Sequence, residues 1–190
     1  METIFSDDLK AYEVALSHIG FPESSNETTI ARNDTHNHAK LLIIEMIARA
    51  KESIKIKSTM FCNSFYSNED LFEAIAETLE ESSVNIEILI ENVKDENSEI
   101  LEKYSKRFAN KISFKELLET DRGKINDFML IDSHSFRWEL SKTKTCSDES
   151  MKNVKAAGFF NTDKEEKYQR KVSLLNEYFM VLSNNARKIS

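Results

Sequence analysis

The sequence predicts an α/β domain in which helices flank a mixed sheet. Segments with the two-residue alternation of a strand follow segments whose apolar residues recur at helical spacing, and this order repeats along the chain. Hydrophobic residues make up 40% of the 190 residues, which is enough for a buried core and suits one domain. Alternation of helices and strands in the first half is typical of parallel strands joined by crossovers.

The first half of the chain supplies most of this alternation. Ser6 can cap a first helix and Gly20 can end it. The run LLIIEMIARA is apolar on most sides, as in a buried helix, whereas SIKIKS and VNIEILIEN alternate as strands do. The expected elements are a helix at 6–20, a linker, a helix at 35–51, a strand at 53–58, a helix at 67–81, a strand at 84–92, a helix at 97–109 and a strand at 111–117.

The second half contains two adjacent strands and a long final helix. An apolar strand at 128–131 is followed by a polar turn and a second strand, in which Phe136 and Trp138 are expected to face the core and Arg137 and Glu139 the solvent. A surface loop, a strand at 154–160 and a helix over the last 28 residues follow. The helix has an apolar stripe of Tyr168, Val172, Leu175, Phe179 and Leu182. We expect residues 1–30 to form an N-terminal helix and linker, and residues 31–190 to form the domain.

Composition argues against several classes of function. A formal net charge of −7 disfavours electrostatic capture of nucleic acid, and only three glycines argue against a glycine-rich phosphate loop. The acidic N-terminus lacks the apolar segment of a signal peptide, and no run of 18 apolar residues predicts a membrane span. Cys62 and Cys146 follow no metal spacing, so we expect unpaired thiols in a cytoplasmic protein that needs no metal or cofactor.

The order of elements resembles the phospholipase D-like family over about residues 30–188. The resemblance consists of a helix and strand in AKLLIIEMIARAKESIKIKS, further helix–strand units, the strand DFMLID, a strand ending in GFFN and a closing helix. The family motif H-x-K-x4-D falls on INDFMLID, which aligns it with Ile125, Asp127 and Asp132. The resemblance thus implies a degenerate single-motif member in which the nucleophilic histidine and the phosphate-binding lysine are both replaced.

These replacements predict that the family's chemistry is lost. Isoleucine cannot act as a nucleophile, and a carboxylate at Asp127 would repel a phosphate. At a separation of about 4 Å this repulsion is roughly 1 kcal/mol in water and about 4 kcal/mol at an effective dielectric near 20. We therefore lean towards a protein that is not an enzyme.

Three other constellations could carry chemistry. The text HNHAKLLIIE places His38, Lys40 and Glu45 at the motif spacing, but residues two apart on a helix point about 200° apart, so they would converge only on a strand. His36 and His38 with Asp34 lack a third ligand fixed by spacing. Asp127, Asp132, His134 and Glu139 could form an acidic metal site, although Asp127 and Asp132 face opposite sides of a regular strand.

The function that we expect is non-enzymatic binding of a protein partner, as an accessory or regulatory subunit in a bacterium or phage. Phe61, Phe65 and Tyr66 follow a strand and could form the partner surface, or could close the end of the sheet instead. Single-motif members of the family usually pair, so the resemblance implies a homodimer. The alternatives are a phosphodiesterase or nuclease with a rearranged site, and a nucleic-acid-binding module. The latter needs a basic face such as Lys51, Lys55, Lys57 and Arg107.

Overall fold

The structure is a computed structural model that describes residues 2–4, 6–18, 27–93, 95–140 and 155–189. Its helices are α1 (Leu9–His18), α2 (His36–Ala48), α3 (Asn63–Tyr66), α4 (Glu69–Glu81), α5 (Asp95–Phe108) and α7 (Glu166–Asn185). Its strands are β1 (Glu2–Ile4), β2 (Thr29–Asn33), β3 (Ser53–Ser58), β4 (Asn85–Ile90), β5 (Ile112–Glu116), β6 (Phe128–Ile131), β7 (Ser135–Glu139), β8 (Ala156–Phe160) and β9 (Arg187–Lys188). Within those ranges, no helix is both long and apolar enough to cross a membrane.

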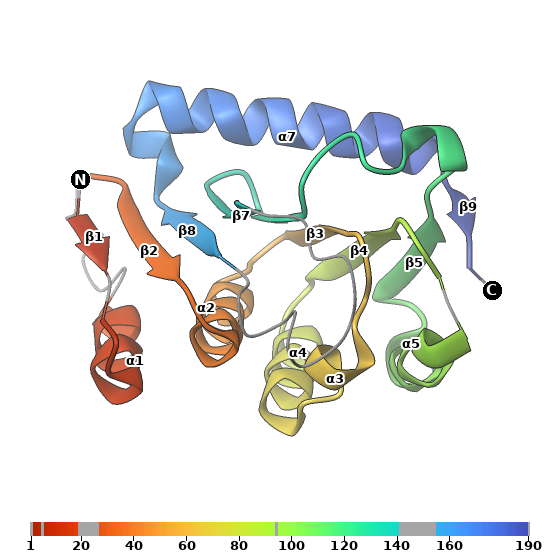
Figure 1. Ribbon diagram of the computed structural model, residues 1–190, viewed down its shortest axis with the longest axis horizontal. Coiled ribbons are helices and arrows are strands. Elements are labelled where there is room, and N and C mark those ends of the chain that lie inside the picture. The colour runs from red at the N-terminus through yellow and green to blue at the C-terminus, as the bar shows by residue number, and fades with distance from the viewer. Residues whose placement is uncertain (1, 5, 19–26, 94, 141–154, 190) are drawn as a thin grey trace.

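The strands form one mixed sheet in the order β1-β2-β8-β7-β6-β3-β4-β5-β9 (Figure 1). β3, β4 and β5 run parallel, joined by helices, as the alternation in the sequence predicts. β6 and β7 form a hairpin that continues the sheet in antiparallel pairing with β3 on one side and β8 on the other. The mixed α/β architecture flanked by helices is therefore confirmed.

Three strands lie where the sequence predicts other structure. β1 and β2 fall in the expected N-terminal extension and linker, so that the expected boundary at residue 30 lies inside β2. β9 lies in the expected terminal helix and pairs with β5. The segment TIARN of β2 has no strong alternation and is held by its partner β8, which is remote in the sequence. Such pairing leaves little local signal. The loop expected after β7 lies outside the described residues.

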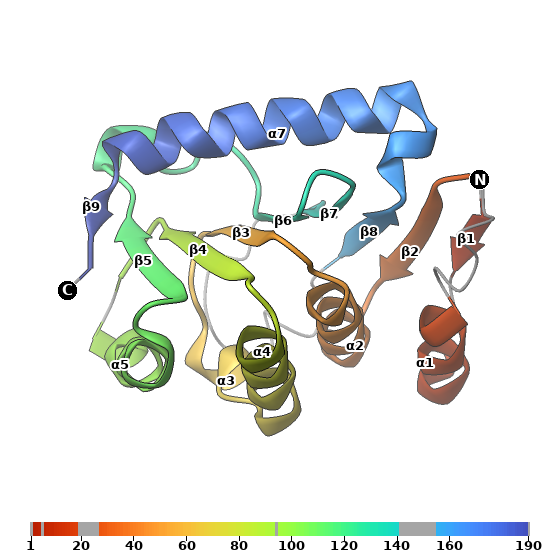
Figure 2. The same ribbon diagram turned by 180° about the vertical axis from the view of Figure 1, so that it is seen from behind.

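The sheet separates two apolar layers (Figures 1 and 2). Helices α1 to α5 pack on one face and bury the larger core cluster, whereas of the described helices α7 alone lies across the other face. The stripe predicted for the last helix is confirmed at four positions, because Val172, Leu175, Phe179 and Leu182 are buried against the sheet and Tyr168 is partly buried beside them.

Gly158 of β8 allows α2 to approach the sheet closely. A Cβ atom at this position would lie 2.9 Å from Leu42 Cδ1 and 3.2 Å from its Cδ2. We expect Gly158→Ala to lower the free energy of unfolding by about 1–3 kcal/mol through overpacking, as measured by urea denaturation. A double-mutant cycle with Leu42→Ala should show favourable coupling, and additive effects would contradict this account of the glycine.

Candidate functional site

Four polar side chains lie in a row at one end of the sheet, between β2 and β3. Strand register places Asn33 of β2 opposite Ala156 of β8, and Ala156 opposite Glu139 of β7. The same register continues to Asp127, just before β6, and to Ser58, the last residue of β3. Asn33, Glu139, Asp127 and Ser58 are all buried. Two carboxylates, Glu139 and Asp127, are therefore cross-strand neighbours, an arrangement that is destabilising unless cations compensate it.

Lys57 and Thr59 compensate the charge of Asp127. Asp127 Oδ1 accepts hydrogen bonds from Lys57 Nζ at 2.8 Å, from the Thr59 backbone N–H at 2.7 Å and from the Thr59 hydroxyl at 2.8 Å. The Lys57 side chain is fully buried and its ammonium also pairs with Glu91 at 2.5 Å. It donates a further hydrogen bond to the Ile125 carbonyl at 3.0 Å. Asp127 is thus one acid of a buried ion-pair network that joins β3 to the start of β6.

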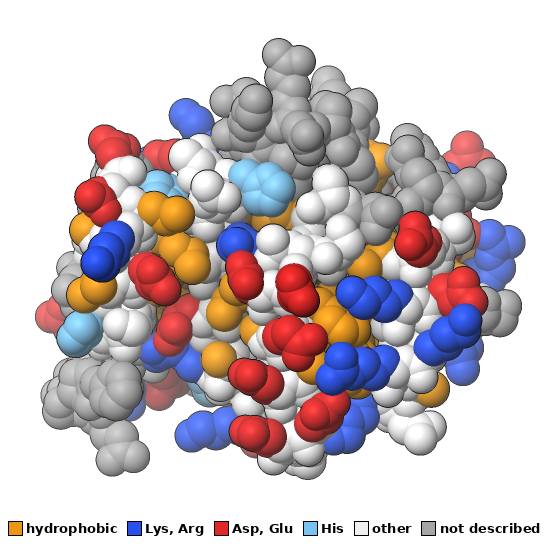
Figure 3. Space-filling view, turned by 90° about the horizontal axis from the view of Figure 1, so that it is seen from below, with side chains coloured by type: hydrophobic (Ala, Val, Ile, Leu, Met, Phe, Trp, Pro, Cys, Tyr) orange, Lys and Arg blue, Asp and Glu red, His pale blue; other side chains and the backbone are white. Residues whose placement is uncertain are grey.

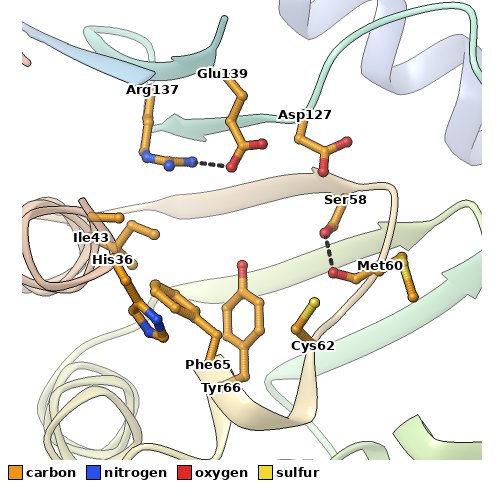
Figure 4. A pocket seen from close by; sticks show the side chains of 11 residues that line it. His36, Ile43, Ser58, Met60, Cys62, Phe65, Tyr66, Asp127, Arg137 and Glu139 are labelled. Carbon is orange, nitrogen blue, oxygen red and sulfur yellow. Dashed lines mark hydrogen bonds and ion pairs between the residues drawn. The ribbon is translucent and has the colours of Figure 1, made fainter. Parts of the chain in front are cut away.

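Arg137 compensates the charge of Glu139. Arg137 Nη1 lies 2.9 Å from Glu139 Oε1, and both residues are buried. The expectation that this charged face of β7 is solvated is wrong, because α2 and α3 cover it, although the two residues do share a face. Burial raises the pKa of the Tyr66 phenol, an effect that Arg137 opposes and that Glu139 and Asp127 reinforce. Figure 4 shows the Tyr66 hydroxyl pointing to the side of the cavity where Arg137, Glu139 and Asp127 lie.

A small cavity lies between this polar row and helices α2 and α3 (Figure 4). Its volume is about 40 Å³, and its walls include His36, Phe65, Tyr66, Arg137 and Glu139. A buried water needs at least about 10–15 Å³ of such space, so the cavity has room for a few waters but not for a phosphodiester.

Cys62 lines the same cavity and is disulfide-bonded, so the expectation of an unpaired thiol is wrong there. Cys146 lies outside the described residues. Disulfides are uncommon in a reducing cytoplasm. The pairing of Cys62 therefore does not support the expected cytoplasmic location, which stays a prediction.

Asp132 lies at the opposite end of β6 and has a local structural task. Its carboxylate accepts hydrogen bonds from the backbone N–H groups of Lys51, Glu52 and Ser53 at 2.8–3.0 Å, which caps the start of β3. Its φ of 52° is left-handed, a conformation that aspartate tolerates better than most residues. His134 Nε2 lies 3.5 Å from its carboxylate.

The acidic metal site considered from the sequence is consequently divided in two. Asp127 and Asp132 are separated by the length of β6, roughly 16 Å at about 3.3 Å per residue. Glu139 stays with Asp127, and His134 stays with Asp132. Across the described ranges, no three histidine, cysteine, aspartate or glutamate side chains gather closely enough to hold a metal ion.

The motif-like residues of α2 do not converge either. The His38 ring is buried with its centroid 4.5 Å from that of Tyr12. Lys40 forms a salt bridge with Asp70 at 2.8 Å, and Glu45 forms one with Arg49, the residue that follows α2. The helix that the apolar run predicts therefore separates these three side chains.

The aromatic residues considered as a partner surface are core residues. Phe61, Phe65 and Tyr66 are 0%, 4% and 8% exposed, so the expectation that they form an exposed surface is wrong. The Phe61 ring stacks on Tyr66 at 3.8 Å and meets the edge of Tyr104. These aromatic residues close the end of the sheet, which was the alternative role predicted for them.

The basic residues considered for nucleic acid are scattered. Lys57 is buried, and Lys55 bonds to Asn176 of α7 on the other side of the sheet. Arg107 pairs with Glu80 on the surface of α4 and α5. They form no common basic face.

The sequence analysis missed Lys57 and Glu91 as partners of Asp127. A usable signal existed, because Lys57 is the second-last residue of the alternating strand SIKIKS and Glu91 directly follows the apolar run ILI. Buried charges at such positions generally need partners. Which carboxylate meets which cation depends on the order of the strands, which the sequence did not provide.

Comparison with known proteins identifies the fold. No family model matches the sequence, and no curated protein is significantly similar to it. Nuc from Salmonella typhimurium, a phospholipase D family member, matches 86% of this chain and 99% of its own, with a TM-score of 0.59 and 15% identity. NucT from Helicobacter pylori matches 86% of this chain and 100% of its own, also with a TM-score of 0.59 and 15% identity.

An archaeal chromatin protein with a novel mode of DNA binding has a similar domain. The match has a TM-score of 0.56 at 15% identity and covers 84% of this chain but 53% of the chromatin protein, so the chain spans about half of that protein's length. At these identities the likeness concerns the fold. The chain has the phospholipase D-like fold that its order of elements predicts.

Proposed function

We propose that this chain is a non-catalytic domain of phospholipase D-like fold that acts by binding a protein partner. The observation that carries the proposal is the engagement of Asp127, at the position aligned with the family's phosphate-binding lysine, by Lys57 and Thr59. Lys57 is shared with Glu91, and Glu139 is the cross-strand neighbour of Asp127. A phosphate at this position would be repelled by carboxylates, and the cations there are already paired with those carboxylates. Ile125 supplies no nucleophile.

The purified protein is accordingly expected not to hydrolyse a phosphodiester such as bis-p-nitrophenyl phosphate, with or without magnesium. Any background rate should be unchanged by Asp127→Asn and by Asp132→Asn, because neither carboxylate acts on substrate. Activity that co-purifies with the folded protein and disappears in Asp127→Asn or Glu139→Gln would overturn the proposal in favour of a rearranged phosphodiesterase site.

The surface beside α7 supports the binding half of the proposal. In the described part of the chain, seven large hydrophobic side chains are exposed, and four of them lie on α7 or beside it: Leu140, Leu174, Met180 and Val181. Exposed apolar residues that gather on one side of a protein typically mark an interface. These residues support a partner surface over α7, away from the aromatic residues that close the end of the sheet.

Nucleic-acid binding is the second candidate, because the similar archaeal chromatin protein binds DNA. Its test is a titration of labelled single- and double-stranded DNA at low and physiological salt. Binding that weakens steeply with salt would support it, since phosphate contacts release counter-ions. Because the lysines are scattered, we expect no binding of DNA at physiological salt.

A further inference from the structure

An apolar groove lies between the first turns of α7 and the strands beneath it. The inner stripe of α7, from Val172 to Leu182, packs on the sheet, and the groove opens beside it with a volume of about 340 Å³. Ala157 of β8 lies in its floor, where strand register places it beside Trp138 of β7. The single methyl group of this alanine leaves a hollow that a larger side chain would fill.

The size and exposure of the groove suit a side chain of a ligand. Its volume reaches the lower end of the range of about 300–1,000 Å³ that is typical of binding pockets. Trp138, Phe159 and Tyr168 are half-buried in its walls, and Leu140 at its rim is 58% exposed. A bound small molecule normally has most of its surface enclosed. A groove that is open along one side instead suits a peptide chain that lies across it and inserts a side chain.

The charge of the groove comes from two lysines on its helical wall. Lys167 and Lys171 lie one turn apart on α7, and none of the described residues that line the groove is acidic. Lys167 pairs with Glu165 at 3.3 Å, but the Lys167 side chain is 63% exposed, and such a surface pair contributes little. A carboxylate of a ligand can therefore compete for it. The opposite face of the molecule, under α1 to α5, instead carries interspersed acidic and basic side chains (Figure 3).

The aromatic rings of the groove already contact one another, which disfavours stacking on nucleobases. Phe136 stacks on Phe159 with the ring centroids 4.4 Å apart. Trp138 lies nearly parallel to Phe128, and the ammonium of Lys171 lies over its ring at 4.3 Å from the centroid. Single-stranded nucleic acid binds by stacking its bases on accessible aromatic faces. An inserted apolar side chain needs only apolar walls, so these observations favour a peptide.

We infer that this groove binds a segment of the protein partner in which a large apolar side chain lies next to aspartate or glutamate. The apolar side chain enters between Trp138 and Tyr168, and the neighbouring carboxylate pairs with the two lysines. Leu140 at the rim and Leu174, one turn beyond Lys171, extend the apolar surface to the flanking residues of the segment. The inference rests on the proposed function, for which it specifies the chemistry of the partner.

The test is a selection from a library of short random peptides displayed on phage, with the full chain as the immobilised target. The selected peptides should share a large apolar residue next to aspartate or glutamate. Fluorescence anisotropy of a labelled selected peptide then gives its dissociation constant. Replacing its apolar residue by alanine, or its acid by the matching amide, should raise this constant about tenfold or more, or ~1.4 kcal/mol. A selection without a shared pattern, or one rich in lysine, would contradict the inference.

Variants of the chain locate the binding site. Lys171→Glu and Leu140→Asp should each raise the dissociation constant of the selected peptide about tenfold or more. Lys171→Glu should regain affinity when the acid of the peptide is exchanged for lysine. Lys103→Glu is the matched control, because Lys103 also lies over an aromatic ring, 3.7 Å from the centroid of Phe72, but on α5 across the sheet. It should bind as the wild type does, and circular dichroism should show every variant folded. A peptide indifferent to both groove variants would place the site elsewhere and overturn the inference.

Two further measurements separate this inference from its alternatives. Labelled oligothymidylate that binds the wild type but not Lys171→Glu would assign the groove to single-stranded nucleic acid and overturn the peptide. A host protein captured equally by the wild type and Lys171→Glu, but lost in Leu174→Asp, would support the proposed function while overturning the groove as its site. Phosphodiesterase activity that disappears in Asp127→Asn would overturn the proposed function and leave the affinity for the peptide unchanged.

Discussion

Lys57→Met is expected to lower the free energy of unfolding by roughly 3–5 kcal/mol, the usual cost of removing one partner from a buried ion pair. Lys57 is the fully buried cation between Asp127 and Glu91. Methionine has a similar length and fills the space without a charge. Two carboxylates would then be left close together in the interior without their shared counter-ion, with Thr59 as the remaining donor to Asp127.

Equilibrium unfolding in urea measures this effect, and Lys55→Met is its matched control. Lys55 lies on the same strand but donates to the Asn176 side chain, so its replacement should cost much less. Adding Asp127→Asn and Glu91→Gln to Lys57→Met should recover part of the lost stability, because neutral amides then replace the two buried carboxylates that needed a cation. Equal effects of Lys57→Met and Lys55→Met would show that the network does not stabilise the fold.

The combination Leu175→Ala and Phe179→Ala is expected to unfold the protein at ordinary temperature. Each truncation of a buried leucine or phenylalanine costs roughly 2–5 kcal/mol, and a domain has about 5–15 kcal/mol in total. Leu175 is 2% exposed and Phe179 is 0% exposed in the smaller core, where Phe179 meets the edge of the Phe128 ring at 6.3 Å. The two lie one turn apart, so their costs need not add.

Leu174→Ala is the control for this pair, because it truncates an exposed leucine of the same helix. At low micromolar concentration it should change the melting temperature little. The single variants Leu175→Ala and Phe179→Ala should each lower it and remain measurable if the double variant does not fold. A double variant that melts with the wild type would mean that α7 is not part of the cooperative fold.

Periodicity predicted the elements whose packing is reflected locally in the sequence. The inner stripe of α7 and the alternation of β3 and β4 are of this kind, since one face of each is buried along its length. The short edge strands β1 and β9 carry no comparable pattern, because three and two residues do not complete a period. Their placement depends on neighbours remote in the chain.

The candidate site was harder to predict for a different reason. Arg137 and Glu139 alternate with aromatic residues, and either face of β7 could have been buried. The fold packs α2 and α3 on the charged face and leaves Trp138 half-exposed beside α7. Hydrophobicity alone chooses the aromatic face, whereas the observed choice depends on a buried ion pair with a cross-strand neighbour. Asp132 is simpler: its capping of β3 requires a local turn and an acceptor.

The ion-pair network around Lys57 also affects whether the family motif could be regained by substitution. If an ancestor carried the histidine and lysine of the family motif, restoring them by Ile125→His and Asp127→Lys would set a second ammonium beside that of Lys57, with Glu91 as the nearest shared counter-ion. Asp127→Lys would be destabilising until Lys57 itself changed, and changing Lys57 first would leave the buried carboxylate of Asp127 without its ammonium partner. A return to catalysis would have to pass through variants that are less stable than both the present protein and the restored one. Compensation of buried charges therefore makes the loss of the motif hard to reverse.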